Sequence, residues 1–134
     1  MRKIFKRKEI YKVKSLSIDP ATMGEPHSAD EYQRRGMAFY ARKQFNKAAS
    51  DLTNAISLDK NHLDAYYCLG MVMKALGRKD EASAAFNQVI NLISANHANH
   101  TSKFDMLRRL ALGHINEMNQ GDWNLEKEIW KRIA

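Results

Sequence analysis

Residues 30–58 read DEYQRRGMAFYARKQFNKAASDLTNAISL, and residues 64–92 read DAYYCLGMVMKALGRKDEASAAFNQVINL. When the second stretch is aligned to the first at an offset of 34 residues, eight positions are identical. The identical pairs are Asp30/Asp64, Tyr32/Tyr66, Gly36/Gly70, Met37/Met71, Ala41/Ala75, Ala48/Ala82, Ile56/Ile90 and Leu58/Leu92. Matching residue types at one fixed offset, mostly at helix-packing positions, predict a tandem helical repeat. Such a repeat indicates a binding protein without identifying its partner.

Each copy is expected to fold as a pair of helices. Ser28 is followed three residues later by Glu31, which is the spacing of a capping box at a helix start. Apolar residues from Ala48 onward recur at helical spacing and predict the second helix of the pair. Gly77 is the expected C-terminal stop of the third helix. The four predicted helices span about 29–42, 45–58, 63–76 and from 80 onward.

This pattern resembles the tetratricopeptide repeat, in which an aromatic residue, Leu-Gly and a second aromatic residue mark the first helix. The second helix carries alanine, an aromatic residue or leucine, and a small residue. The matching residues are Tyr32, Arg35-Gly36, Phe39, Ala48, Leu52 and Ala55 in the first copy, and Tyr66, Leu69-Gly70, Met73, Ala82, Phe86 and Val89 in the second. Arg35 and Met73 depart from the family pattern, which asks for leucine and an aromatic residue there.

A third, degenerate repeat is expected toward the C-terminus. Leu112-Gly113 resembles Leu69-Gly70, and Gly121-Asp122-Trp123 resembles the turn and opening of a second helix. The resemblance implies an all-α, right-handed superhelical stack of about three repeats and six helices. Its expected units are a domain over 29–134 with repeats at about 29–62, 63–96 and 106–134, the last after an insertion near 94–102.

The basic character of the chain is concentrated at its N-terminus. The formal net charge is +7, and residues 1–14 hold seven cations against Glu9. Residues 1–28 are therefore interpreted as a basic arm, extended or conditionally ordered. The arm residues with candidate binding roles are Arg2, Lys3, Phe5, Lys6, Arg7, Lys8, Tyr11, Lys12 and Lys14.

Three partners fit this arm, and a solvated tail is the fourth alternative. Phe5 and Tyr11 among the cations suit RNA, through phosphate pairing and base stacking. The cations also suit an anionic membrane surface. Apolar residues that continue beyond the charges, such as Leu16 and Ile18, favour docking on a protein surface, either the groove of the same chain or an acidic surface of a partner. The RNA- or ribosome-associated role is kept as the alternative function.

In the family, the first helices of successive repeats line a groove. Mapping the inward positions onto this chain gives candidate groove residues Gln33, Met37, Tyr40, Tyr67, Met71, Lys74, Leu110 and His114. Methionines and aromatic residues suit an apolar or helical segment of a protein partner, although about half of these residues could be ordinary core. A chaperone carboxylate tail is rejected, because Gln33, Met37 and Tyr67 stand where charge-assisted donors would be needed. The implied function is a non-catalytic adaptor, as a subunit or assembly factor of a larger complex.

Trp123 and Trp130 lie seven residues apart and share one face of a helix. Two alternatives stay open for them: packing on the preceding helix, or an exposed interface for a partner or a second copy of the chain.

Enzymatic and metal-dependent functions are not expected. His97 and His100 have only Asp105 nearby, and no phosphate-binding loop or nucleophile with a placed base is present. No cofactor is therefore predicted. Cys68 is the only cysteine, which excludes an intramolecular disulfide and suits a buried position. Charges interrupt the apolar residues near the N-terminus, so no signal peptide or transmembrane segment is predicted and a cytoplasmic location is the default.

Overall fold

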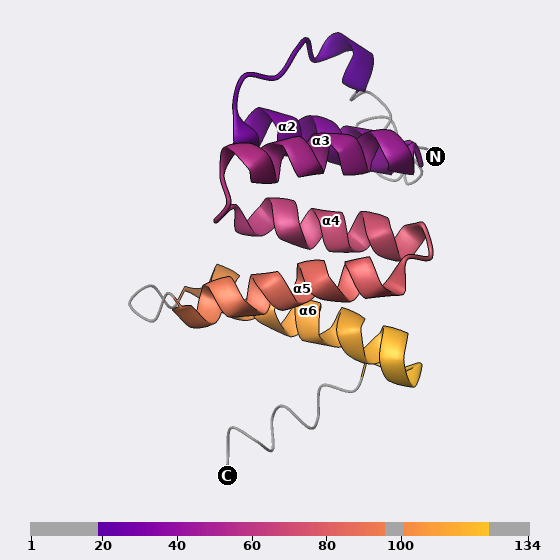
Figure 1. Cartoon of the computed structure of the whole chain (residues 1–134), viewed down its shortest axis with the longest axis vertical. Helices are drawn as coiled ribbons and strands as arrows, with labels where there is room; N and C mark the ends of the chain where they lie inside the picture. Colours follow the sequence, from indigo (N-terminus) through magenta and orange to yellow (C-terminus); the bar gives the residue numbers. More distant parts are fainter. Residues whose placement is uncertain (1–18, 96–100, 124–134) are drawn as a thin grey trace, which may run out of the picture.

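The computed structural model describes residues 19–95 and 101–123. Over these residues the chain forms one short 3-10 helix and five α-helices, stacked one after another along the long axis of the molecule (Figure 1). The elements are η1 (Pro20–Thr22), α2 (Ala29–Ala41), α3 (Phe45–Leu58), α4 (Leu63–Ala75), α5 (Lys79–Ala95) and α6 (Ser102–Gln120). The predicted all-helical repeat stack is confirmed.

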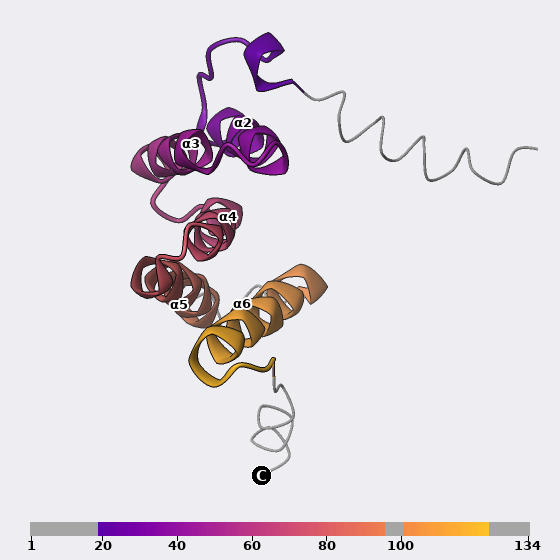
Figure 2. The ribbon, with the colours of Figure 1, turned by 90° about the vertical axis from the view of Figure 1, so that its right-hand side faces the viewer.

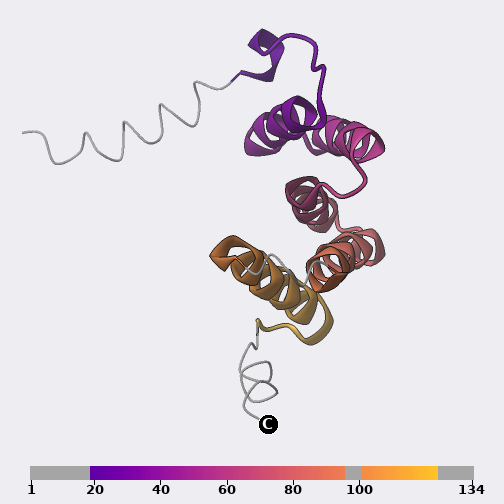
Figure 3. The same cartoon turned by 90° about the vertical axis from the view of Figure 1, so that its left-hand side faces the viewer.

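The helices are arranged in two layers. Figure 2 shows α2, α4 and α6 along one side of the stack and α3 and α5 along the other, and Figure 3 shows the same division from the opposite side. Each helix packs on the next one in sequence, and α2 also contacts α4 directly. The first helices of successive hairpins therefore share one face, which we call the α2–α4–α6 face.

Side-chain caps and glycines set the helix ends. Ser28 Oγ accepts the Glu31 N–H at 3.2 Å, as the capping-box spacing predicted. The Glu31 carboxylate accepts the N–H of His27 at 2.6 Å, one residue before the usual partner of this motif. Gly77 follows α4 with φ +77°, and Gly121 ends α6 with φ +83°. Glycine adopts this left-handed conformation without a Cβ penalty, so both turns are encoded locally.

Close contacts within each hairpin form where the first helix carries a glycine. A Cβ on Gly36 would lie 3.0 Å from Leu52 Cγ, and a Cβ on Gly70 would lie 2.6 Å from Phe86 Cε1. Leu52 and Phe86 are fully buried, together with Val72, Val89 and Ile93. The missing side chain is what allows a large side chain of the second helix to pack onto the backbone of the first.

Arg35, the departure from the family pattern in the first repeat, is held by a buried partner. Its Nε and Nη2 atoms donate to the two carboxylate oxygens of Asp51 at 2.7 and 2.8 Å. The guanidinium carbon also lies 5.9 Å from the Tyr32 ring centroid and 5.8 Å from that of Phe39. The second repeat carries Leu69 and Ala85 at the equivalent positions. The first repeat therefore has a charged pair where the second repeat carries two apolar residues.

The third repeat differs from the prediction in the residue at which its first helix begins. Its first helix begins at Ser102, about one turn before the expected Met106, because Thr101 Oγ1 caps it by accepting the Phe104 N–H at 3.2 Å. The described residues contain five α-helices where six were expected. The expected sixth helix falls in residues 124–134, outside the described ranges. The basic part of the arm (1–18) and residues 96–100 of the expected insertion also lie outside them.

In the part of the chain that the structure describes, no helix has the length and apolar character needed to cross a membrane.

Candidate protein-binding face

The predicted groove residues come from three helices that share the α2–α4–α6 face. Gln33, Met37 and Tyr40 belong to α2, Tyr67, Met71 and Lys74 to α4, and Leu110 and His114 to α6. Direct contacts join Tyr67, Lys74 and His114. The other five predicted residues are half-buried.

Tyr67, Lys74 and His114 form a connected polar network between α4 and α6. The Tyr67 hydroxyl lies 3.1 Å from His114 Nε2, and Lys74 Nζ lies 3.0 Å from His114 Nδ1. Both ring nitrogens of His114 are therefore engaged by α4. Contacts across 47 and 40 residues of sequence tie the second repeat to the third at this point.

Aromatic rings hold the His114 side chain in place. Its ring stacks on Phe86 with centroids 4.8 Å apart and an interplanar angle of 7°. Trp123 meets the same ring edge-on at 4.7 Å, and Tyr67 lies against Phe86 at 5.7 Å. His114 is 8% exposed, so its hydrogen bonds compete little with water.

This environment keeps His114 neutral. Burial, and then the positive charge of Lys74, lower the pKa of His114 from 6.5 to about 4, although Glu117 acts in the opposite direction. Burial is also the main cause that raises the pKa of Tyr67 above its ordinary value. At neutral pH the network therefore consists of a neutral imidazole, a protonated phenol and a lysine ammonium.

Glu117 completes the network on α6. Its carboxylate lies 2.6 Å from Lys74 Nζ, and the hydrogen bond from Lys74 is the main cause that lowers the pKa of Glu117. Lys74 thus has two acceptors of its own, the Glu117 carboxylate and the His114 ring. Its ammonium group is therefore paired within the fold.

The remaining predicted residues contribute mainly half-buried apolar surface. Met37 and Tyr40 pack beside a buried cluster shared by α3 and α4, and Met71 packs beside a second cluster shared by α4, α5 and α6. Gln33 donates from Nε2 to the Sγ of Cys68 at 3.4 Å, which links α2 to α4. Leu110 helps line a separate depression of about 440 Å³ formed by α6 residues.

Cys68 itself is buried and free, as the sequence indicated. Burial raises the pKa of its thiol to about 11. The thiol therefore packs as a small apolar side chain and is a poor nucleophile at neutral pH.

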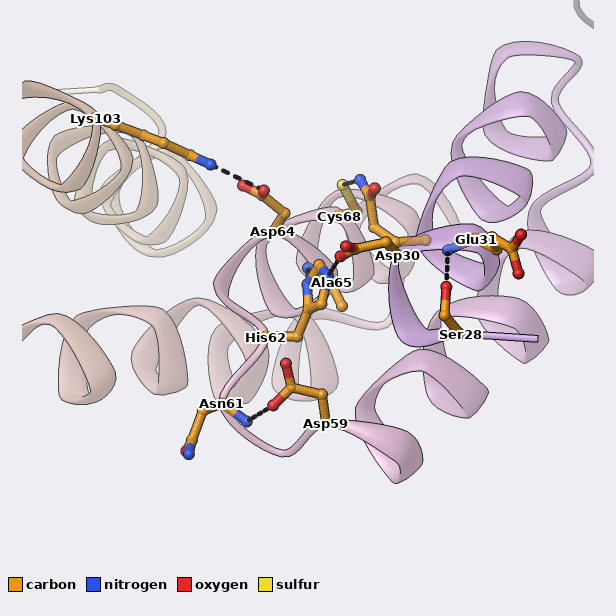
Figure 4. Close-up of polar contacts among 11 residues, drawn as sticks. Ser28, Asp30, Glu31, Asp59, Asn61, His62, Asp64, Ala65, Cys68 and Lys103 are labelled. Atoms are coloured by element: carbon orange, nitrogen blue, oxygen red, sulfur yellow. Dashed lines mark hydrogen bonds and ion pairs between the residues drawn. The ribbon is translucent and has the colours of Figure 1, made fainter. Parts of the chain in front are cut away.

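One edge of the face is braced by polar contacts that the repeat pattern did not predict (Figure 4). Asp30 of α2 lies 2.6 Å from His62 Nε2, while His62 Nδ1 accepts the Ala65 N–H and caps α4. Asp64 of α4 accepts from Lys103 of α6 at 3.0 Å. Asp30 and Asp64 are one of the identical pairs at the repeat offset, and that identity was the available signal.

Trp123 packs inward on α6. A Cβ on Gly113 would overlap the Trp123 ring, and the Trp123 carbonyl accepts from Asn116 Nδ2 at 3.0 Å. Trp130 lies outside the described residues, as do all the arm residues named above. The proposed interface through Trp123 and Trp130 stays a prediction.

Comparison with known proteins agrees with this architecture. A family model described as a TPR repeat matches residues 36–77, and a model described as the tetratricopeptide repeat matches residues 63–96. Small glutamine-rich tetratricopeptide repeat-containing protein 2 of Saccharomyces cerevisiae is 31% identical over 80 residues, covering 60% of this chain and 23% of that protein. Protein bimA of Emericella nidulans is 29% identical over 76 residues, covering 57% of this chain and 9% of that protein.

The fold and the matched segments define a helical repeat scaffold of the protein-interaction class. The chain is a tetratricopeptide repeat protein. It spans less than a quarter of the length of the two curated relatives.

Proposed function

We propose that the chain is a non-catalytic adaptor within a larger complex, and that it binds an apolar segment of a protein partner on the α2–α4–α6 face. The observation that carries this proposal is the composition of the face: it carries half-buried Met37, Tyr40, Met71 and Tyr67, and its lysine is already paired with Glu117. Adaptable methionines and aromatic anchors favour apolar side chains. A lysine already paired with a carboxylate offers little to a partner's carboxylate.

Panning of a phage-displayed library of random 16-residue peptides on the full chain tests this function. Selected peptides should bind the wild-type chain and lose at least tenfold in affinity to the variant Tyr40→Ala/Met71→Ala, because burial of these side chains contributes the binding energy. Asn54→Ala/Asn87→Ala is the matched control, since both residues are exposed on α3 and α5. Circular dichroism at the assay temperature checks that each variant is folded. If no peptide is selected, or if both double variants bind equally well, the proposal is wrong.

For the basic arm, we propose docking on an acidic surface of the same partner complex. Support comes from the sequence alone: seven cations between Arg2 and Lys14, with apolar residues continuing to Ile18. The alternative is that the arm binds RNA phosphates. A fluorescent 20-nucleotide RNA separates the two. Phosphate binding should weaken steeply as salt rises from 50 to 200 mM and should be lost when residues 2–14 are neutralised. No detectable binding at 50 mM salt would exclude the RNA alternative.

A further inference from the structure

The network of Lys74, His114 and Tyr67 has a fixed hydrogen-bond direction. A lysine ammonium carries donors and no acceptor. At 3.0 Å from Lys74 Nζ, His114 Nδ1 must therefore accept, so it carries no proton. A neutral imidazole with a bare Nδ1 carries its proton on Nε2. Nε2 is then the donor in its 3.1 Å contact with the Tyr67 hydroxyl.

This direction determines what Tyr67 presents to a partner. Because its oxygen accepts from His114, the Tyr67 hydroxyl cannot place its own hydrogen on that ring. Within residues 19–95 and 101–123, His114 is the only hydrogen-bond partner of the Tyr67 hydroxyl. Among these residues the hydroxyl hydrogen has no acceptor, so a partner can supply one. A partner that covered it without an acceptor would bury an unsatisfied donor, which is unfavourable.

The donor is also rigidly placed. Phe86 and Trp123 hold the His114 ring on two sides, which fixes the position of Nε2. Tyr67 lies edge-on against Phe86 at 5.7 Å, so its phenol has little freedom to turn away. A fixed donor on a face that also carries half-buried apolar side chains has the features of a specificity element in a binding site.

We propose that the Tyr67 hydroxyl donates a hydrogen bond to a backbone carbonyl oxygen of an extended apolar segment bound on the α2–α4–α6 face. This inference rests on the proposed function and names the chemistry of the partner. A carboxylate is disfavoured as the acceptor, because Glu117 lies 2.6 Å from Lys74 and would repel a second negative charge. An extended segment is favoured over a helix, whose internal carbonyl groups are already bonded within the helix.

The test uses peptides selected by the library described above, with Kd measured by isothermal titration calorimetry. Tyr67→Phe removes the hydroxyl and keeps the ring, and it should weaken binding about tenfold. Tyr66→Phe is the matched control and should leave the Kd within twofold, because Tyr66 is also on α4 but lines a depression shared with α5 and is not a groove residue. Lys74→Met should weaken binding as Tyr67→Phe does, because the His114 ring can then reverse its tautomer and accept the Tyr67 hydrogen.

A second measurement changes the bound peptide. Replacing single peptide bonds of the selected peptide by esters weakens the carbonyl acceptors one at a time. One ester position should lower the affinity for the wild-type chain and have no further effect on Tyr67→Phe, since the two changes remove the same hydrogen bond.

The outcomes separate this inference from the function on which it rests. If peptides bind the face, as judged by Tyr40→Ala/Met71→Ala, but Tyr67→Phe retains the wild-type Kd, the inferred donor is wrong and the proposed function stands. Additive effects of the ester and Tyr67→Phe would also overturn the inferred donor. If no peptide depends on the face, the function and the inference both fail.

Discussion

Acidification from pH 7 to pH 5 should destabilise the fold through His114. The ring is 8% exposed and is stacked on Phe86, and its pKa is lowered from 6.5 to about 4. In the unfolded chain the same imidazole takes up a proton near pH 6.5. Between these two values the unfolded state binds more protons than the folded state. The stabilisation from a neutral His114 is therefore present above pH 6.5 and is lost as the pH falls toward 4.

The size of the effect follows from the two pKa values. Integrating the proton-binding difference between pH 7 and pH 5 gives a loss of at most about 2 kcal/mol in the free energy of unfolding. The structural cause is specific: a protonated ring would place an N–H on Nδ1, only 3.0 Å from the Lys74 ammonium, with no acceptor between them. Both burial and this repulsion oppose the charged form.

Urea unfolding of the wild-type chain and of His114→Gln, at pH 7, 6 and 5, measures the effect. His114→Gln keeps polar atoms near Lys74 but does not titrate in this range. The variant should be less stable than the wild-type chain at pH 7. Between pH 7 and 5, its free energy of unfolding should fall by about 2 kcal/mol less than that of the wild-type chain. All other histidines are common to both chains, so the difference between the two profiles isolates His114. Parallel profiles would refute the reasoning.

Three further outcomes are expected. Arg35→Leu should lower the free energy of unfolding by about 3 kcal/mol, because it leaves the buried Asp51 carboxylate unpaired. Adding Asp51→Ala should restore most of this loss, and no recovery in the double variant would contradict the pairing. Gly70→Ala should lower the free energy of unfolding by about 2 kcal/mol, since overlap with the buried Phe86 ring outweighs the gain in helix propensity. An unchanged midpoint of urea unfolding would count against this packing. At pH 8, dithionitrobenzoate should label Cys68 at least about a hundredfold faster in urea than in the native chain, because the buried thiol has a pKa of about 11. Equal rates would show that the thiol is accessible in the native chain.

The helical frame could be predicted from the sequence because its signals are local. The predicted second helix over 45–58 matches α3 at both ends, since the apolar period and the turns beside it depend only on neighbouring residues. Ser28 caps α2 as its spacing to Glu31 predicted. The first four helices therefore needed no tertiary information. The repeat offset added the order in which they stack.

Pairings between side chains could not be predicted in the same way. Arg35 was seen as a departure from the family pattern, but its partner Asp51 lies sixteen residues later on another helix. Only a comparison of the two copies, where both positions change together to Leu69 and Ala85, carried that signal. For the binding face, the family resemblance placed Tyr67 and His114 among the candidate groove residues. The hydrogen-bond direction that makes Tyr67 a donor depends on interatomic distances that no sequence pattern supplies.

The third repeat differs from the first two in the residue that covers the glycine of its first helix. In the first two hairpins, the glycine of the first helix is covered by a side chain sixteen residues later, Leu52 over Gly36 and Phe86 over Gly70. At Gly113 the covering ring is Trp123, ten residues later and beyond the end of α6. A glycine leaves a space on its helix that any large side chain within reach can fill, so the spacing of the covering residue can change while the packing is kept. The same Trp123 ring also holds His114, so the change in spacing helps to orient the network on the binding face. In this chain, therefore, the irregular third repeat contributes to the proposed binding face a contact that the two regular copies lack.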